Sequence, residues 1–318
     1  MTWFQRLLII TIVATFALVV IGGTVRATGS GEGCPDWPTC HGKLIPKLEK
    51  HTIIEYSHRS AATAVGILFL GVTFFTFKTE RRNKLVFWLA FAAGVVLAWQ
   101  IILGGITVKK DLPASIVAAH LATAMSFMGL MLVTAVISLM RARGARATPM
   151  RAISPYTKVA IAAAAVAFAT LVLGSYISGT DASLACSSWP TCHGSSLVGT
   201  GSAQGMHMLH RFVAGLLGIV LLVLLYEAFE ARREQPLLFA LPLFAALAYL
   251  AQALIGAANI WTTLAAGVVV AHLSMAALLW CVLVTTAALS FYLPGREPAA
   301  AGREAVPGER GKVAEWAH

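Results

Sequence analysis

The chain has 318 residues, of which 58% are hydrophobic and 12% are charged, and its mean hydropathy is +0.76. So little polar surface could not solvate soluble domains of this total length, and the composition therefore indicates an integral membrane protein. The formal net charge is +10, but the basic residues form pairs and triplets that flank apolar segments. This distribution argues against a nucleic-acid-binding stripe.

Apolar segments recur eight times, and each is long enough to cross a hydrocarbon core of about 30 Å as a helix. We expect an all-α integral membrane fold with eight transmembrane helices. Their predicted limits are 7–27, 53–77, 85–106, 114–140, 158–178, 205–227, 237–258 and 265–290. Of the 24 basic residues, 16 lie at the N-terminus or after the second, fourth, sixth and eighth spans. The positive-inside rule therefore predicts that both termini are cytoplasmic.

The first span also has the outline of a signal peptide. Arg6 precedes an apolar stretch, and Val25, Arg26 and Ala27 loosely resemble a cleavage site. The long apolar region favours a retained helix instead, because removing it would leave seven spans and disrupt the sorting of charge.

The loops after the first and fifth spans each contain a C-x5-C pair, Cys34 with Cys40 and Cys186 with Cys192. Both loops are predicted to lie outside the cytoplasm, where disulfides persist. Neither contains C-x-x-C-H, so covalent haem attachment is not indicated. We expect structural disulfides. A redox-active first pair is the alternative, because the Pro and Trp between its cysteines could strain the loop.

Ionisable side chains within the spans are costly, and each is a candidate functional residue. They lie near the outer ends of the even-numbered spans: Glu55, His58, Arg59, His120, His207, His210, Arg211 and His272. Four of the histidines share one depth, two in each half of the chain. Two imidazoles facing each other suit the axial positions of a haem iron. Zinc or a proton relay are the alternatives, although a closed zinc site needs four ligands.

The chain is an internal duplication with an offset of 152 residues. Residues 22–42 align with residues 174–194, with nine of the twenty-one positions identical. The same offset superimposes the cysteine pairs, the four histidines, and Gln100 on Gln252. We expect two four-helix units related by a pseudo-twofold axis along the membrane normal. The predicted divisions are an N-terminal unit at 1–140, a cytoplasmic linker at 141–157, a C-terminal unit at 158–290 and a disordered cytoplasmic tail at 291–318.

One position distinguishes the two units, because His207 occupies the place of Glu55. Glu55 is three residues before His58 and shares its helix face. A carboxylate there suits a proton acceptor, or a group that stabilises positive charge developing on substrate, and it could also pair with Arg59. We therefore assign chemistry to the N-terminal unit and a permanently held haem to the C-terminal unit. Arg59 and Arg211 are expected to bind haem propionates, and contact with lipid phosphates is the alternative.

Together these residues resemble the haem A synthase family of the cytochrome oxidase assembly pathway over about residues 5–290. The resemblance rests on Glu55-Tyr-Ser-His58-Arg59, His120, His210-Arg211, His272 and the outer C-x5-C pairs. It implies an oxidoreductase that converts a methyl group of haem O, through successive hydroxylations, into the formyl group of haem A. By position, His58 and His120 would hold haem O or haem A with Glu55 essential, and His210 and His272 would ligate haem b.

The resemblance also implies a bacterial cell membrane location, with haem O synthase and the oxidase assembly machinery as partners. The identity of the electron donor or acceptor stays open, and so does the question of whether the protein forms a homo-oligomer. A two-haem quinol oxidoreductase or cytochrome b-like carrier is an alternative, as is a haem transporter or chaperone that does not need Glu55. Because every ligand lies near the outer face, lateral movement of substrate fits better than transmembrane electron transfer. Cys281 is expected to be a packing residue, and His207 and the tail match no functional motif.

Overall fold

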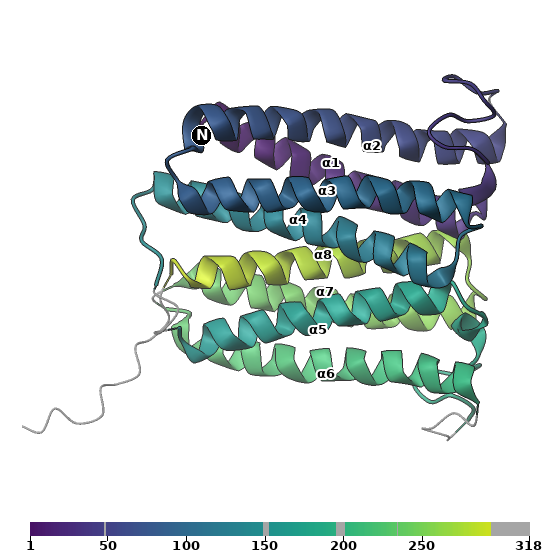
Figure 1. The fold of residues 1–318 in the computed structure, drawn as a ribbon. Helices are drawn as coiled ribbons and strands as arrows, with labels where there is room; N and C mark the ends of the chain where they lie inside the picture. Colours follow the sequence, from purple (N-terminus) through teal and green to yellow (C-terminus); the bar gives the residue numbers. More distant parts are fainter. Residues whose placement is uncertain (48, 149–152, 195–200, 234, 294–318) are drawn as a thin grey trace, which may run out of the picture.

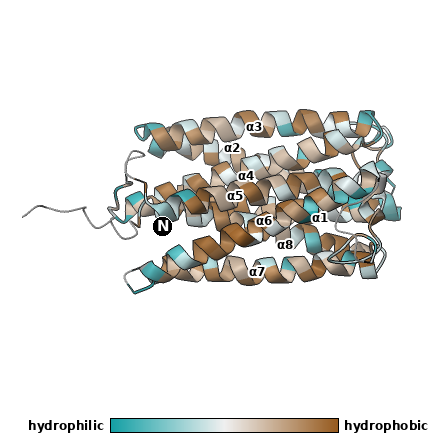
Figure 2. Ribbon diagram, turned by 90° about the horizontal axis from the view of Figure 1, so that it is seen from below, coloured by the Kyte–Doolittle hydropathy of each residue, from teal (hydrophilic) through white to brown (hydrophobic). Residues whose placement is uncertain are grey.

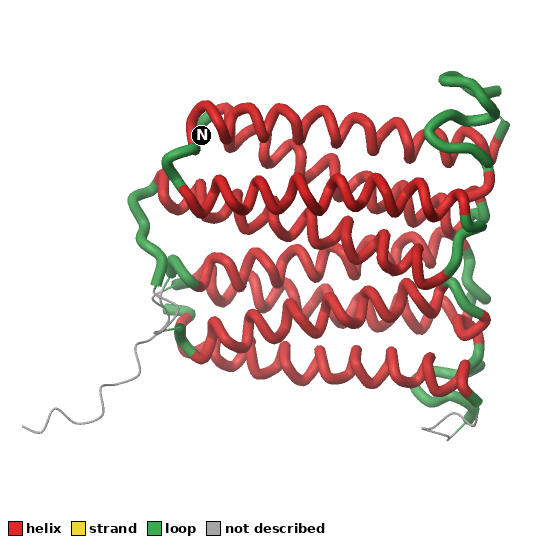
Figure 3. Tube along the Cα trace, in the orientation of Figure 1, coloured by secondary structure: helices red, strands yellow, loops and turns green. Residues whose placement is uncertain are grey.

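The computed structural model describes all residues except 48, 149–152, 195–200, 234 and 294–318. The described residues form long, roughly parallel helices joined by loops and short helical turns (Figure 3). In chain order the elements are α1 (Trp3–Ala27), η1 (Ser30–Glu32), α2 (Lys50–Phe75), η2 (Thr76–Glu80), α3 (Lys84–Lys109), α4 (Ala114–Ala142), α5 (Pro155–Ser178), η4 (Asp181–Leu184), α6 (Ser202–Ala231), α7 (Pro236–Trp261) and α8 (Ala266–Ser290).

The eight predicted spans are confirmed: within the part of the chain that the structure describes, eight helices are long and apolar enough to cross a membrane. Most extend a few residues beyond the predicted limits, because a helix continues into the interfacial region after its apolar stretch ends. Local capping fixes several starts. The side chain of Thr2 accepts from the backbone N–H of Gln5 at 3.2 Å, and Gln5 Oε1 accepts in return from the N–H of Thr2 at 3.0 Å.

The helices pack as pairs of neighbours in sequence, α1 with α2, α3 with α4, α5 with α6 and α7 with α8 (Figure 1). The two halves of the chain meet where α1 contacts α8, α4 contacts α5 and α4 contacts α8. Exchanging the halves maps this set of contacts onto itself, as a pseudo-twofold axis between α4 and α8 requires. At that junction a Cβ atom on Gly129 would lie 2.7 Å from the Trp280 ring, so the two helices approach closely.

The duplication extends to the turns between helices. Asp111 and Leu112 after α3 have φ angles of 55° and 58°, and Thr263 and Leu264 after α7 have φ angles of 53° and 62°. These pairs are 152 residues apart. The Leu112 N–H donates to the Thr107 carbonyl at 3.0 Å, and the equivalent Leu264 N–H donates to Asn259 at 2.8 Å. Both halves therefore end their third helix with the same turn.

Apolar side chains cover the outside of the bundle as well as its core. Ile10 is 53% exposed, Phe91 55% and Leu222 68%, as expected for residues that face lipid. Polar residues gather at the two ends of the helices (Figure 2). We call the end that carries the two cysteine loops the disulfide end, and the other the opposite end.

The remaining sequence predictions concern Cys281, the linker and the tail. Cys281 is a free cysteine of intermediate exposure that packs against a core cluster, as predicted. Residues 149–152 of the predicted linker and 294–318 of the predicted tail lie outside the described residues. The four predicted divisions of the chain stay predictions.

Candidate functional site

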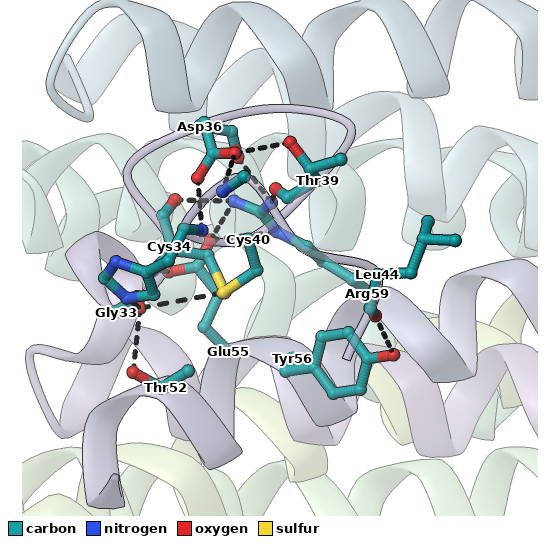
Figure 4. The surroundings of a disulfide bond; sticks show 12 residues. Gly33, Cys34, Asp36, Thr39, Cys40, Leu44, Thr52, Glu55, Tyr56 and Arg59 are labelled. Carbon is teal, nitrogen blue, oxygen red and sulfur yellow. Dashed lines mark hydrogen bonds and ion pairs between the residues drawn. A yellow bond between two sulfur atoms is a disulfide. The ribbon is translucent and has the colours of Figure 1, made fainter. Parts of the chain in front are cut away.

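Both predicted disulfides are present at the disulfide end. The S–S distance is 1.96 Å for Cys34–Cys40 and 2.05 Å for Cys186–Cys192. The first loop lies over the start of α2, where the Thr52 hydroxyl donates to the Gly33 carbonyl at 3.0 Å (Figure 4). The cysteine loop is therefore attached to the helix that carries Glu55, His58 and Arg59.

Glu55 and Arg59 form an ion pair beneath this loop. Glu55 Oε1 lies 2.7 Å from Arg59 Nη2, and the two side chains are only 5% and 16% exposed. The second carboxylate oxygen accepts from the backbone N–H of Cys34 at 3.1 Å. Among the described residues, Glu55 is the only carboxylic acid classed as buried. The ion pair weighed from the sequence is thus present, and the loop backbone holds the second carboxylate oxygen.

The Arg59 guanidinium ties the carboxylate to the loop. Beyond Glu55, it donates to three loop carbonyls: Cys34 at 2.7 Å, Asp36 at 2.6 Å and Thr39 at 2.8 Å. With its two bonds to Glu55, all five of its N–H groups have acceptors. A bond to a haem propionate would replace one of these contacts, and that role for Arg59 stays a prediction.

Asp36 organises the loop from within. Its carboxylate accepts from the Thr39 hydroxyl, from the backbone N–H of His41 at 2.5 Å and from that of Gly42 at 2.8 Å (Figure 4). The Thr39 hydroxyl, followed by the Gly42 N–H, lowers the pKa of Asp36 to about 2. Because this folded-state pKa is depressed, the carboxylate is ionised and these bonds are complete at any pH well above 4.

The C-terminal unit repeats the arginine clamp without the carboxylate. Arg211 donates to the carbonyls of Pro190 at 3.0 Å and Thr191 at 2.8 Å, and Thr191 corresponds to Thr39. Its other terminal nitrogen lies 3.4 Å from Nε2 of His207, the residue at the position of Glu55. His207 is 9% exposed, so the sequence difference places an imidazole where the N-terminal unit has a buried acid.

Each of the four aligned histidines packs edge-on against a glycine of a neighbouring helix. A Cβ atom added to the glycine would make a tight contact with the imidazole Cε1, so a larger residue would require the ring to shift. The distances are 3.0 Å for Gly22 and His58, 3.2 Å for Gly104 and His120, 2.9 Å for Gly174 and His210, and 3.0 Å for Gly256 and His272. We call these four positions the glycine seats.

The imidazoles form two pairs, one in each unit. His58 on α2 and His120 on α4 belong to the first unit, and His210 on α6 and His272 on α8 belong to the second. In each unit the two helices that carry the histidines lie diagonally across the bundle. In the first unit α2 and α4 each pack on both α1 and α3, and in the second unit α6 and α8 each pack on both α5 and α7. By the helical rise of about 1.5 Å per residue, all four lie roughly 9–12 Å from the start of their helices at the disulfide end.

The histidine nitrogens have unused hydrogen-bonding capacity. Nδ1 of all four aligned histidines is buried without a partner among the described residues. A metal-binding imidazole commonly donates the N–H of one ring nitrogen to a carbonyl or carboxylate and binds the metal through the other nitrogen.

A glutamine lies beside His120 and another lies beside His272, and the sequence predicted no functional role for either. Gln100 Nε2 lies 3.2 Å from Nε2 of His120, and Gln252 Nε2 lies 3.4 Å from Nε2 of His272. The Thr123 hydroxyl donates to Gln100 Oε1, whereas Gln252 Oε1 has no partner among the described residues. The only sequence sign of this contact is that two glutamines in apolar spans repeat at the 152-residue offset.

These residues would fit a haem held by two histidines in each unit. Two imidazoles per unit, each with a buried, unpartnered Nδ1 and each seated on a glycine in an apolar bundle, form a donor set that could hold a haem iron. Within the described ranges, no three His, Cys, Asp or Glu side chains gather to hold a metal ion, so the zinc alternative has no ligand set there. In the N-terminal unit alone, a buried carboxylate lies one helical turn from a paired histidine.

Comparison with known proteins gives a consistent family. Residues 5–284 match the model of the COX15-CtaA family, described as cytochrome oxidase assembly protein. Relatives named "Heme A synthase" include one from Shouchella clausii, 31% identical across 81% of this chain and 87% of the relative. Those from Alkalihalophilus pseudofirmus and Shewanella oneidensis are each 28% identical, across 88% and 90% of this chain and 95% of each relative.

Proposed function

The chain belongs to the COX15-CtaA family of cytochrome oxidase assembly proteins, and we propose that it is a haem A synthase. The reaction oxidises one porphyrin methyl group of haem O to the formyl group of haem A. This conversion removes electrons and protons and adds one oxygen atom, so it needs an acid–base group beside the substrate and a separate electron acceptor. The buried Glu55 beside His58 is the observation that carries the proposal.

The N-terminal unit is the proposed substrate site. His58 and His120 would hold haem O, with Gly22 and Gly104 setting the position of the two rings. His210 and His272 would ligate a haem b cofactor in the C-terminal unit. A haem held by these two histidines would supply one-electron transfer when bound. The presence of Glu55 in one unit and His207 in the other supports assigning chemistry to the first unit and electron transfer to the second.

Glu55 is positioned to accept a proton. The Cys34 N–H and the Arg59 guanidinium bond its two oxygens, while the cysteine loop covers it. A carboxylate so held can take a proton lost from the substrate methyl or from water, or stabilise positive charge developing there. Arg59 and the loop keep the carboxylate in place and limit access of bulk water.

The location and partners follow the same proposal. We infer a bacterial cell membrane protein with both termini cytoplasmic and the disulfide end outside. The basic flanks of the opposite end support this orientation, with Lys78, Arg81 and Arg82 between α2 and α3 and Lys84 at the start of α3. Haem O would come from the bilayer or from haem O synthase, and haem A would pass to the oxidase assembly machinery.

Replacing Glu55 separates this function from the two alternatives. Glu55→Gln should lower haem A formation by roughly 100-fold or more, because it removes the acid–base group. Both histidine pairs should still bind haem, as measured by absorption spectra and pigment extraction. His207→Gln is the matched control and should keep most activity. A quinol oxidoreductase or a haem carrier would be little affected by Glu55→Gln, and unchanged haem A formation would refute the assignment.

A further inference from the structure

The seam between the second and third helices is closed in the C-terminal unit. The Tyr249 hydroxyl on α7 donates to the Ala214 carbonyl on α6 at 3.0 Å. The same oxygen would lie 2.6 Å from a Cβ atom on Gly218, so the tyrosine is seated on that glycine. This contact joins α6 to α7 along the seam.

The equivalent seam in the N-terminal unit lacks this contact. At the 152-residue offset, Tyr249 corresponds to Leu97, Ala214 to Ala62 and Gly218 to Gly66. Leucine cannot donate the hydrogen bond, and a Cβ atom on Gly66 would meet nothing within 4 Å. Correspondingly, α2 with its continuation η2 packs less extensively on α3 than α6 packs on α7.

A cavity of about 260 Å³ lies along the α2–α3 seam. Its wall includes Thr73 of α2 and Gly94 and Ala98 of α3. Larger residues replace all three at the equivalent positions of the C-terminal unit: Leu225, Ala246 and Leu250. At these three positions the C-terminal unit carries more side-chain volume, whereas Leu243 and Ala228 are smaller than their counterparts Phe91 and Thr76.

The cavity opens toward lipid and is mostly apolar. Phe77, Phe91 and Val95 also line it and are 56%, 55% and 56% exposed. We call this cavity and its exposed rim the α2–α3 groove.

The groove begins near the glycine seat of His120 on α3. Ala98 is six residues before Gly104, the glycine seat of His120, which corresponds to about 9 Å along α3. Phe87, at the far end of the groove, is a further eleven residues away, or roughly 16 Å. Along α3 the groove therefore starts about 9 Å from the seat of His120, whereas on α2 its nearest wall residue, Thr73, lies about 22 Å past His58, and the groove extends toward the opposite end of the bundle.

We propose that the isoprenoid tail of haem O lies in the α2–α3 groove. This inference rests on the proposed function, because haem O carries a long apolar chain that haem b lacks. The unit assigned to haem O has the open, apolar groove, and the unit assigned to haem b has the seam closed by Tyr249. The groove would bind the tail and direct the substituted edge of the porphyrin toward α2 and α3.

Filling the groove with the residues of the closed seam tests this proposal. In Leu97→Tyr/Ala98→Leu, affinity of the N-terminal unit for haem O should fall by about tenfold, the order seen when a few methylene groups alter an apolar pocket. Affinity for haem b, which has no tail to displace, should stay unchanged. Both are measured by absorption titration of the purified protein that already holds haem in the C-terminal unit.

Two further variants control for folding. Ala64→Leu adds the same side chain at an exposed position of α2 that does not line the groove, and should leave both affinities unchanged. Gly94→Ala fills the groove by one methyl group and should give a smaller, tail-specific loss if the double variant does not fold. Equal loss for haem O and haem b, or no loss for haem O, would overturn the groove assignment. A wild-type protein that binds haem O but forms no haem A would instead refute the proposed function alone.

Discussion

Glu55 is stabilised at the disulfide end by two different kinds of donor. The Arg59 guanidinium bonds one carboxylate oxygen and the Cys34 N–H bonds the other. A buried ion pair is weak evidence for stability in itself, but removing one partner leaves an uncompensated buried charge. The loop contacts of Arg59 mean that such a change would also release the cysteine loop from α2.

Arg59→Gln should therefore destabilise the protein, by about 3 kcal/mol on the scale typical of broken buried pairs. Removing the buried charge as well, in Glu55→Gln/Arg59→Gln, should recover part of that loss. The measurement is thermal unfolding of the purified protein in detergent. Arg211→Gln is the matched control with a smaller expected effect, since its partner is His207. If both arginine variants lowered the melting temperature equally, the unpaired Glu55 carboxylate would not be the cause of the destabilisation in Arg59→Gln.

The residues of the site were predictable to the extent that ionisable groups in apolar spans are rare and costly. Glu55 and the four aligned histidines could be identified on that basis. The loop contacts of Arg59 could not, because its acceptors are backbone carbonyls that any residue supplies. Thr123 was missed for a related reason: a hydroxyl in a transmembrane helix usually bonds its own backbone, and nothing in the sequence shows that it also reaches Gln100.

At the scale of the helix, the glycine seats determine how closely one helix approaches the imidazole of the next. Helix interiors normally favour Ala over Gly by roughly 0.5–1 kcal/mol, so a glycine retained at each seat indicates a need for space. The four seats recur at the duplication offset and meet the same ring atom. We therefore expect them to belong to the proposed haem sites rather than to general helix packing.

Gly174→Ala should release the haem b proposed for the C-terminal unit, because the added methyl group would lie 2.9 Å from Cε1 of His210. Gly215→Ala in α6 is the control, since an added methyl group there meets nothing within 4 Å. Haem content per protein, from pigment extraction, should fall in the first variant and stay constant in the second. Full haem content in Gly174→Ala would show that the seat does not position His210.

The cysteine loop acts on the site through its backbone. Because the N–H and carbonyl of Cys34 bond Glu55 and Arg59, opening the disulfide should loosen the cover over the carboxylate without removing a reactant. Cys34→Ser/Cys40→Ser should keep part of the haem A synthesis, and a thiol reductant should lower wild-type activity to the same level. Complete loss of activity would favour the redox role instead.

The helices themselves follow from hydrophobicity and length, and all eight were predicted within a few residues. Their packing was less predictable. The difference between the open α2–α3 seam and the closed α6–α7 seam depends on one hydroxyl, that of Tyr249 on α7, and on several small differences in side-chain volume between equivalent positions. Composition and periodicity do not record such differences, and they became meaningful only after the two units could be compared in three dimensions.

For the whole molecule, duplication provides two similar sites that can be assigned different tasks. The repeat was visible in sequence because the cysteine loops, histidines and turns share one offset. Three differences between the units bear on the proposed sites. Glu55 stands opposite His207, Gln100 accepts from Thr123 whereas Gln252 has no such hydroxyl partner among the described residues, and the α2–α3 seam is open whereas the α6–α7 seam is closed. All three differences set the N-terminal unit apart, and we infer that it is the unit that processes substrate.

The haem content of cells that express this protein with a supply of haem O tests the division of labour most directly. Pigments extracted from purified wild-type protein should contain haem b and haem A. His58→Ala should retain haem b but form no haem A, whereas His210→Ala should lose haem b. A wild-type protein without haem A, or equal losses of haem b in the two variants, would contradict the account.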